Sequence, residues 1–224
     1  MTAREAPDAA PPIVGRPAFD EALAAQIEAE KEVTRLGDRV SAARRRLPMI
    51  EVEDYEFTGP DGPVRLTELF GDHYLLLVQN VMYGADWGDE GCPSCTWATD
   101  NLPQRMGRFD EHGIAFAMVS QGPIEKLQAW REKQGWDHTW VSSGGTTYDD
   151  DWGWIHRSEG YTGPQPGYSY YLLRDGRPYL TYMTRARGTE AILPLAHIMD
   201  RTVYGRQQDW EDSPEGWPQE PTYG

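Results

Sequence analysis

Two cysteines, Cys92 and Cys95, stand three positions apart in this chain of 224 residues, with Pro93 and Ser94 between them. A disulfide between them closes a loop so short that the chain-entropy model gives it only about 2 kcal/mol of stabilisation. A structural crosslink gains more by joining distant segments, so the spacing points to redox or metal chemistry. Thiol–disulfide exchange requires an attacking thiolate and a second thiol that resolves the mixed disulfide, and a Cys-x-x-Cys pair provides both.

The two cysteines are expected to have different roles. At the start of a helix, Cys92 lies near unpaired backbone N–H groups that favour its thiolate, whereas Cys95 lies one turn further in and is more buried. We therefore predict that Cys92 is the nucleophile and Cys95 the resolving residue. Asp86, Asp89 and Glu90 precede the pair and oppose a negative charge on Cys92. Because the helix end contributes only about 0.3–1 kcal/mol, we expect no strongly lowered pKa at Cys92.

Five neighbouring residues are candidates for contacting the substrate. Pro93 stiffens the turn between the cysteines, and the Ser94 hydroxyl can cap the helix or donate to a sulfur. Trp87, Trp97 and Tyr83 flank the pair and offer an aromatic surface. The commoner role of each aromatic side chain is packing in the core or against a loop.

A metal site is the alternative for the same two sulfurs. Thiolates suit Cu(I) or Zn²⁺, with a histidine or a carboxylate to complete the coordination. Of the five histidines, His156 in an aromatic-rich stretch is the best-placed ligand, although a lone histidine more often lies on the surface or packs in the core. The acidic run at 149–151 is more typical of a solvated or helix-capping segment than of a calcium site. In the redox interpretation no cofactor is needed.

The elements around the pair are predicted from hydrophobic patterning. The apolar run YLLLVQNV at 74–81 indicates a central strand, and Ile114–Ser120 a second buried strand. A helix is expected from Cys95 to Glu111. The pair then lies beyond the carboxyl end of an early strand, where open α/β sheets place their sites.

The rest of the pattern completes an α/β domain. A helix opens at Pro123 and ends at Gly135, and 168–173 and 178–183 form a hairpin. A last helix is expected over 190–203, interrupted or kinked near Pro194. Residues 144–167 are predicted to be a long loop or insert. A β-α-β half followed by a β-β-α half predicts a mixed central sheet flanked by helices.

Composition divides the chain into four parts. We predict a disordered N-terminus over residues 1–17, a helical extension over 18–48, the α/β domain over 49–205 and an irregular C-terminal tail over 206–224. The apolar stripe of the helical extension either covers the domain or forms a homodimer seam. Fewer than three clean heptads make the seam the weaker alternative.

The formal net charge of −15 limits the classes of partner. An acidic surface repels phosphate backbones and anionic membranes, so no nucleic-acid or membrane partner is expected. The first 15 residues lack the apolar run of a secretory signal, and a cytoplasmic protein is the expectation. No nucleotide-binding signature is present, so an external thiol or a thioredoxin-type reductant would supply electrons to an unidentified substrate.

Three stretches resemble a known family. MYGADWGDEGCPSCTWATDNL at 82–102, WVSSGG at 140–145 and YGRQQDWEDSPEGWP at 204–218 are similar to bacterial thioredoxin-like proteins classed as dithiol–disulfide oxidoreductases of unknown function. The resemblance covers most of the chain from about residue 20. It implies a thioredoxin-like fold, in which a cis-proline usually precedes the strand facing the cysteines, and Pro166 is the candidate for that position.

Two further interpretations rest on other features. A non-enzymatic, partner-binding module would use the aromatic stretch from Tyr148 to Tyr168 and the Trp-bearing tail as contact surfaces. A peroxiredoxin would place Thr or Ser three residues before its reactive cysteine, and Asp89 stands there instead.

Overall fold

The structure is a computed structural model that describes residues 5, 7–103 and 106–220. It consists of two compact units, one formed by residues 48–194 and the other by residues 1–47 together with 195–224. The outermost parts of the predicted N-terminal segment and tail, at 1–4, 6 and 221–224, lie outside the described residues.

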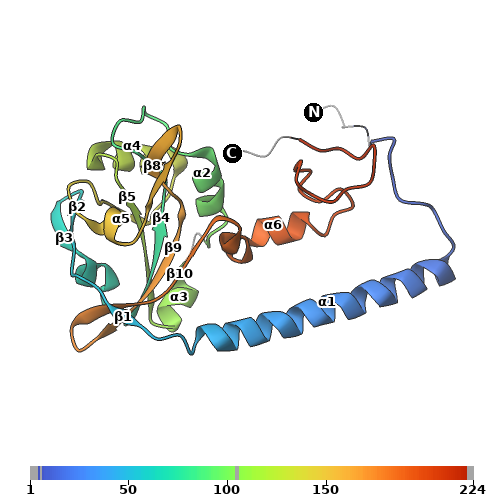
Figure 1. Cartoon of the computed structure of the whole chain (residues 1–224), viewed down its shortest axis with the longest axis horizontal. Coiled ribbons are helices and arrows are strands. Elements are labelled where there is room, and N and C mark those ends of the chain that lie inside the picture. The colour runs from blue at the N-terminus through green and yellow to red at the C-terminus, as the bar shows by residue number, and fades with distance from the viewer. Residues whose placement is uncertain (1–4, 6, 104–105, 221–224) are drawn as a thin grey trace. The chain divides into compact units, whose positions relative to one another are not determined.

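The centre of the 48–194 unit is an eight-stranded mixed sheet with the order β1-β10-β9-β4-β5-β6-β2-β3 (Figure 1). Strands β4 (Leu75–Asn80), β5 (Ile114–Ser120) and β6 (Thr139–Ser142) run parallel, and β9 (Gly167–Arg174) pairs antiparallel with β4. The outer strands are β1 (Ile50–Glu51), β2 (Glu56–Gly59), β3 (Gly62–Arg65) and β10 (Arg177–Arg185). The predicted mixed α/β sheet flanked by helices is confirmed.

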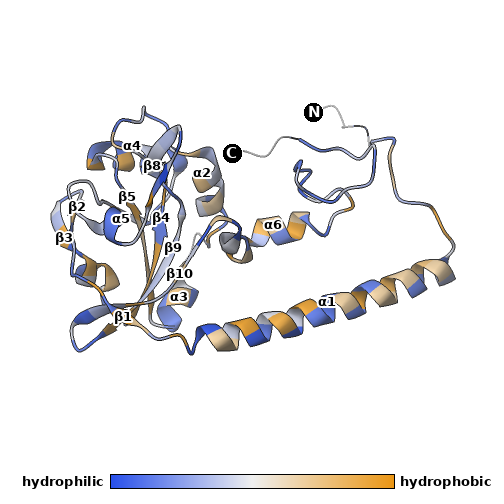
Figure 2. Ribbon diagram, viewed as in Figure 1, coloured by the Kyte–Doolittle hydropathy of each residue, from blue (hydrophilic) through white to orange (hydrophobic). Residues whose placement is uncertain are grey.

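Alternation along β5 separates two cores on opposite faces of the sheet. Ala117 and Val119 join the core under the 3-10 helix η1 (Leu66–Phe70) and the short helix α5 (Tyr148–Asp151). Met118 points to the other face, where Cys95 of α2 (Pro93–Asp100) and Leu127 of α4 (Ile124–Gln134) pack. The period of two in a strand produces this separation. Figure 2 shows β5 in the hydrophobic colour, as expected for a strand covered on both faces.

The helix predicted over 95–111 is wrong in its extent. Helix α2 ends at Asp100, and a separate helix α3 begins at Gly107 and ends at Glu111. Pro103 explains the break, because proline has no N–H to donate and disfavours helical geometry at Leu102. The interruption predicted near Pro194 in the last helix is confirmed, because the 3-10 helix η2 (Ala186–Ile192) is followed by a separate helix α6 (Pro194–Met199). Pro194 takes the first position of a new helix.

The loop predicted over 144–167 is instead largely structured. It contains α5 and a hairpin of β7 (Ile155–Ser158) and β8 (Tyr161–Pro164). Tyr148 and Trp154 are buried at 0% and 1% exposure, and both belong to the core under η1 and α5. These aromatic side chains are therefore core residues and not the contact surface that a partner-binding module would need.

The second unit contains α1 (Arg16–Arg44), none of whose residues is buried, and an irregular tail. Within the tail, Gln208 and Glu220 form an isolated bridge. The Tyr204 hydroxyl donates to the Ala9 carbonyl over 2.8 Å, so the tail and the N-terminal segment are in contact. The homodimer seam along α1 stays a prediction. Within the described residues, no helix has the length and apolar character that a bilayer crossing requires.

Candidate active site around the cysteine pair

The cysteine pair lies at the start of α2, which follows the carboxyl end of β4. Cys92 is the N-cap residue with φ −61° and ψ 124°, and Pro93 occupies the first helical position, where its missing N–H has no cost. Gly91 precedes the pair in close contact with Trp130, and a Cβ at this position would lie 2.8 Å from the indole nitrogen. The loop therefore needs glycine at this position to bring the cysteines against α4.

The two sulfurs differ in exposure and in hydrogen bonding. Cys92 is half-buried, whereas Cys95 is 3% exposed, and both are in the free thiol state. The Cys95 N–H donates to Cys92 Sγ over 3.4 Å, and the Met82 N–H donates to Cys95 Sγ over 3.4 Å. Pro93 and Ser94 are exposed on the outer side of the turn.

These surroundings separate the pKa values of the two thiols. A hydrogen bond from the Cys95 thiol, followed by the N–H groups of Cys95 and Ser94, lowers the pKa of Cys92 to about 6, although burial opposes the shift. Donation of its proton to Cys92 is the largest cause that raises the pKa of Cys95, and burial adds to it. At neutral pH the arrangement favours a thiolate on Cys92 beside a neutral thiol on Cys95.

The neighbouring carboxylates do not keep the pKa of Cys92 at that of an ordinary thiol. Asp89 is 98% exposed and lies 3.8 Å from Lys126 Nζ, and Glu90 is 79% exposed and lies 3.3 Å from Lys133 Nζ. Both carboxylates face water and a lysine, so their charge has little effect on the sulfur. None of the three acidic residues is among the causes of the Cys92 shift.

The aromatic neighbours divide between packing and exposure. Tyr83 is fully buried, and its hydroxyl donates to the Gly88 carbonyl over 2.8 Å, so it holds the loop and offers no surface to a substrate. Trp87 is half-buried with its ring 6.2 Å from that of Tyr83, and its carbonyl accepts from Lys126 Nζ over 2.7 Å. Trp97 is half-buried and lines a pocket beside Cys95.

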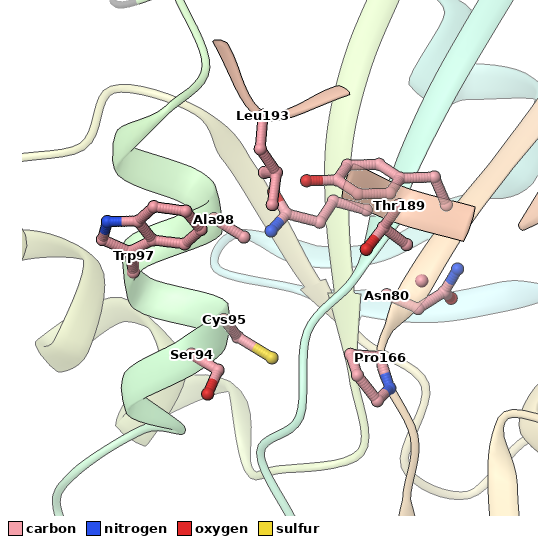
Figure 3. Close-up of a pocket in the computed structure, with 11 residues that line it drawn as sticks. Asn80, Ser94, Cys95, Trp97, Ala98, Pro166, Thr189 and Leu193 are labelled. Atoms are coloured by element: carbon pink, nitrogen blue, oxygen red, sulfur yellow. The ribbon is translucent and has the colours of Figure 1, made fainter. Parts of the chain in front are cut away.

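That pocket has a volume of about 160 Å³ and lies between α2 and the start of β9. Figure 3 shows the Cys95 sulfur directed from α2 toward Pro166, with Leu193 and Thr189 on another side of the space. Ser94, Trp97 and Ala98 form the helical wall. Of the residues predicted from the sequence, the structure therefore brings Cys95, Ser94, Trp97 and Pro166 together around this pocket. Tyr83 does not line it.

Pro166 occupies the expected place with a different peptide geometry. It directly precedes β9, whose first residue is Gly167, one position earlier than the predicted hairpin strand. No peptide bond between described residues is cis, so the bond before Pro166 is trans. Pro166 is therefore not a cis-proline, a question that the sequence left open.

Metal binding by Cys92, Cys95 and His156, the alternative to redox chemistry, finds no support among the described residues. His156 is exposed on β7 with its ring 5.9 Å from that of Tyr161. Among the described residues, no group of three or more His, Cys, Asp or Glu side chains converges as a metal site would require.

Sequence reasoning missed Gln79, Tyr168 and Tyr161 at this site. Gln79 and Tyr168 line the pocket beside Cys95. Burial raises the pKa of Tyr161, and the charges of Cys92 and Cys95 contribute to the shift. One signal was available, because Gln79 and Asn80 interrupt the apolar run of β4 and a buried amide needs a partner.

Comparison with solved structures identifies proteins of the same fold. Peroxiredoxin Q of Xanthomonas campestris matches at 16% identity with a TM-score of 0.50, over 63% of this chain and 87% of that one. Peroxidoxin BcpB from Mycobacterium tuberculosis matches at 18% identity with a TM-score of 0.50, over 66% of this chain and 94% of that one. These likenesses show a thioredoxin-like fold. A comparison with proteins of curated function gave no match.

Comparison with family models gives a match over almost the whole chain. The model described as "Bacterial protein of unknown function (DUF899)" aligns with residues 8–223. This range includes both cysteines, the sheet that carries them and most of the C-terminal tail. The chain therefore belongs to the DUF899 family of bacterial proteins.

Proposed function

We propose that the protein is a dithiol–disulfide oxidoreductase in which Cys92 is the nucleophile and Cys95 the resolving thiol. The observation that carries the proposal is the asymmetry of the pair. Cys92 is half-buried with a pKa of about 6, and the buried Cys95, with a raised pKa, donates to it. A thiolate is the attacking species in exchange, and a thiol pKa near ambient pH gives the best compromise between thiolate fraction and nucleophilicity.

The reaction follows from these positions. The Cys92 thiolate attacks one sulfur of a substrate disulfide, a mixed disulfide forms, and the first thiolate leaves and takes up a proton. Cys95 then loses its proton and attacks Cys92 Sγ, which closes the Cys92–Cys95 disulfide and releases the second thiol. The substrate is reduced by two electrons and the protein dithiol is oxidised. An external thiol or thioredoxin-type protein returns the pair to the dithiol state.

Matched cysteine variants test this assignment. Cys95→Ser is expected to accumulate a mixed disulfide on Cys92 when the reduced protein meets a small disulfide, because the resolving thiol is absent. Cys92→Ser is expected to form no such adduct. Intact-mass spectrometry measures both, and an adduct on Cys95 in the Cys92→Ser protein at the wild-type rate would refute the assigned roles of the two cysteines.

Peroxide reduction is a second candidate for the same thiolate. The observation that favours it is the likeness in fold to two peroxiredoxins, together with the acidity of Cys92. The thiolate would attack a peroxide oxygen to give a sulfenic acid and an alcohol, and Cys95 would condense with it and release water. Asp89 stands three residues before Cys92, where a peroxiredoxin has Thr or Ser, and it is exposed and directed to Lys126. Peroxide reduction is therefore the weaker candidate.

Stopped-flow oxidation by hydrogen peroxide separates the two candidates. Exchange predicts a rate constant like that of an unassisted small-molecule thiolate. A rate constant orders of magnitude larger that is lost in Cys92→Ser would favour peroxide reduction.

A further inference from the structure

Two side chains that line the pocket beside Cys95 each carry a buried polar atom with no hydrogen-bond partner among the described residues. Gln79 is 3% exposed and Tyr168 is 2% exposed, and neither Gln79 Oε1 nor the Tyr168 hydroxyl has a hydrogen-bond partner among the described residues. Both side chains line the pocket. Leaving buried polar groups unpaired is costly, so their presence in one cavity calls for a partner there.

The hydrogen-bond pattern fixes the orientation of the Gln79 amide. The Thr99 hydroxyl donates its proton to the Cys95 carbonyl over 2.9 Å and so can only accept from Gln79. Gln79 Nε2 lies 3.0 Å from Thr99 Oγ1 and is the donor in that bond. The atom left for the pocket is therefore the carbonyl oxygen, which can only accept a hydrogen bond.

The two unpaired groups lie side by side on one face of the sheet. Gln79 of β4 and Tyr168 of β9 are direct partners in the antiparallel register. Side chains of such partners point to the same face with their Cβ atoms about 4.5–5.5 Å apart. Burial is the main cause that raises the pKa of Tyr168, so its hydroxyl stays protonated and can donate.

The size and charge of the pocket limit what can bind. A cavity of about 150 Å³ holds a benzene molecule, so the space of about 160 Å³ beside Cys95 accommodates a group of similar size. None of the residues that line it is Asp, Glu, Lys, Arg or His. Burying a charged group without a partner is costly, so the occupant is uncharged.

We infer that this pocket binds the uncharged, amide-bearing arm of a small disulfide substrate. The amide N–H donates to Gln79 Oε1, and the Tyr168 hydroxyl donates to the amide carbonyl. A secondary amide provides both groups within one short arm, and Cys95, the resolving thiol, lines the same pocket. The inference rests on the proposed exchange reaction and adds the class of substrate to it.

One arm of the substrate stays covalently attached to Cys92 until Cys95 attacks. Attack by the Cys92 thiolate breaks the substrate disulfide, and one half of the substrate becomes joined to Cys92 while the other leaves as a thiol. The retained arm extends into the pocket beside Cys95. Attack by Cys95 on Cys92 Sγ then breaks the mixed disulfide, and the arm leaves as the second thiol.

Two neutral disulfides provide the test on the reduced full-length protein. The disulfide of N-acetylcysteamine carries an amide two carbons from each sulfur, and bis(2-hydroxyethyl) disulfide carries a hydroxyl there. For each disulfide, the rate constant for loss of both protein thiols is measured and divided by the rate constant with which dithiothreitol reduces the same disulfide. This division removes the difference in intrinsic reactivity between the two disulfides. We expect the normalised ratio to favour the amide by roughly tenfold, the order expected for two hydrogen bonds between neutral groups.

Tyr168→Phe removes only a hydroxyl that has no hydrogen-bond partner in the described part of the chain. It is expected to reduce the amide preference roughly threefold, as loss of one hydrogen bond would. Gln79→Met removes the acceptor at similar length, and a thermal melt checks that it is folded. Tyr179→Phe is the matched control, because Tyr179 on β10 is not among the residues that line the pocket, and it should keep the wild-type preference.

The outcomes separate the two claims. If neither disulfide oxidises the wild-type protein, the proposed function fails and the inference fails with it. If both oxidise it with a normalised ratio near unity, the exchange function stands and the amide subsite is refuted. The amide subsite would also be refuted if the Tyr168→Phe and Tyr179→Phe proteins showed equally large amide preferences.

Discussion

The backbone N–H of Cys95 donates to the Cys92 sulfur, and the nitrogen and sulfur are 3.4 Å apart. One turn of helix thus carries the resolving thiol and also an N–H donor to the attacking thiolate. The same geometry exposes Cys92 partly and buries Cys95. The difference in reactivity between two identical side chains therefore follows from their places in the first turn of α2.

Removing the Cys95 side chain should make Cys92 less acidic. Cys95→Ala deletes the hydrogen bond that is the largest cause of the low pKa of Cys92, so this pKa should rise toward that of an ordinary thiol. Ultraviolet absorbance of the thiolate across a pH titration measures it. Cys95→Ser keeps an O–H donor and should give an intermediate pKa. An unchanged pKa in Cys95→Ala would mean that the backbone N–H groups alone stabilise the thiolate.

Neutralising the nearby carboxylates should leave Cys92 unchanged. In Asp89→Asn with Glu90→Gln, two exposed charges that lie against Lys126 and Lys133 are removed, and exposed charges of this kind contribute little. The same absorbance titration should return the wild-type pKa. A clear fall would show that the carboxylates act on the sulfur after all.

The stability of the reduced protein should depend on pH through Cys92. The folded pKa is lowered to about 6, so the stabilisation is complete above the unfolded thiol pKa and is lost as pH falls through about 6. Between about pH 5 and about pH 8, below the ordinary thiol pKa of about 8.5, wild type should gain stability relative to Cys92→Ser. Urea unfolding of both proteins under reducing conditions measures the difference. A constant difference across this range would contradict the low pKa.

Tyr148 tests the core on the other face of the sheet. Its buried hydroxyl donates to Asn80 Oδ1 over 3.1 Å and lies 3.1 Å from the Tyr171 hydroxyl. Tyr148→Phe leaves Asn80 without that donor and should lower the free energy of unfolding by about 1–3 kcal/mol. Tyr179→Phe serves as the comparison. Equal stability of the two variants in urea would show that water or Tyr171 replaces the lost bond.

Local patterns were sufficient to predict the central strands of the sheet and the place of the cysteines. The apolar run at 74–81 predicts the strand β4. The cysteine pair that follows this strand along the chain marks the start of α2. These features depend on short-range chemistry, namely alternation, turn residues and the place of proline at a helix start.

Long-range packing decided the features that sequence reasoning missed. Asp89 is only three positions from Cys92 along the chain, but its carboxylate lies against Lys126 of α4. The sequence near the cysteines gives no sign of this contact, because α4 is distant in the chain. Gln79 and Tyr168 are 89 positions apart and meet only through the register of β4 and β9. The polar composition of residues 144–167 predicts a loop or insert, yet Tyr148 and Trp154 from this segment belong to the core.

Alkylation of the reduced full-length protein across pH tests the central claim most directly. Iodoacetamide reacts with the thiolate, and mass spectrometry assigns the modification to Cys92 or Cys95. We predict that modification of Cys92 rises with a midpoint at a pH of about 6, while Cys95 stays unmodified over the same range. Equal modification of the two cysteines, or a midpoint at the pH of an ordinary thiol, would contradict the claim.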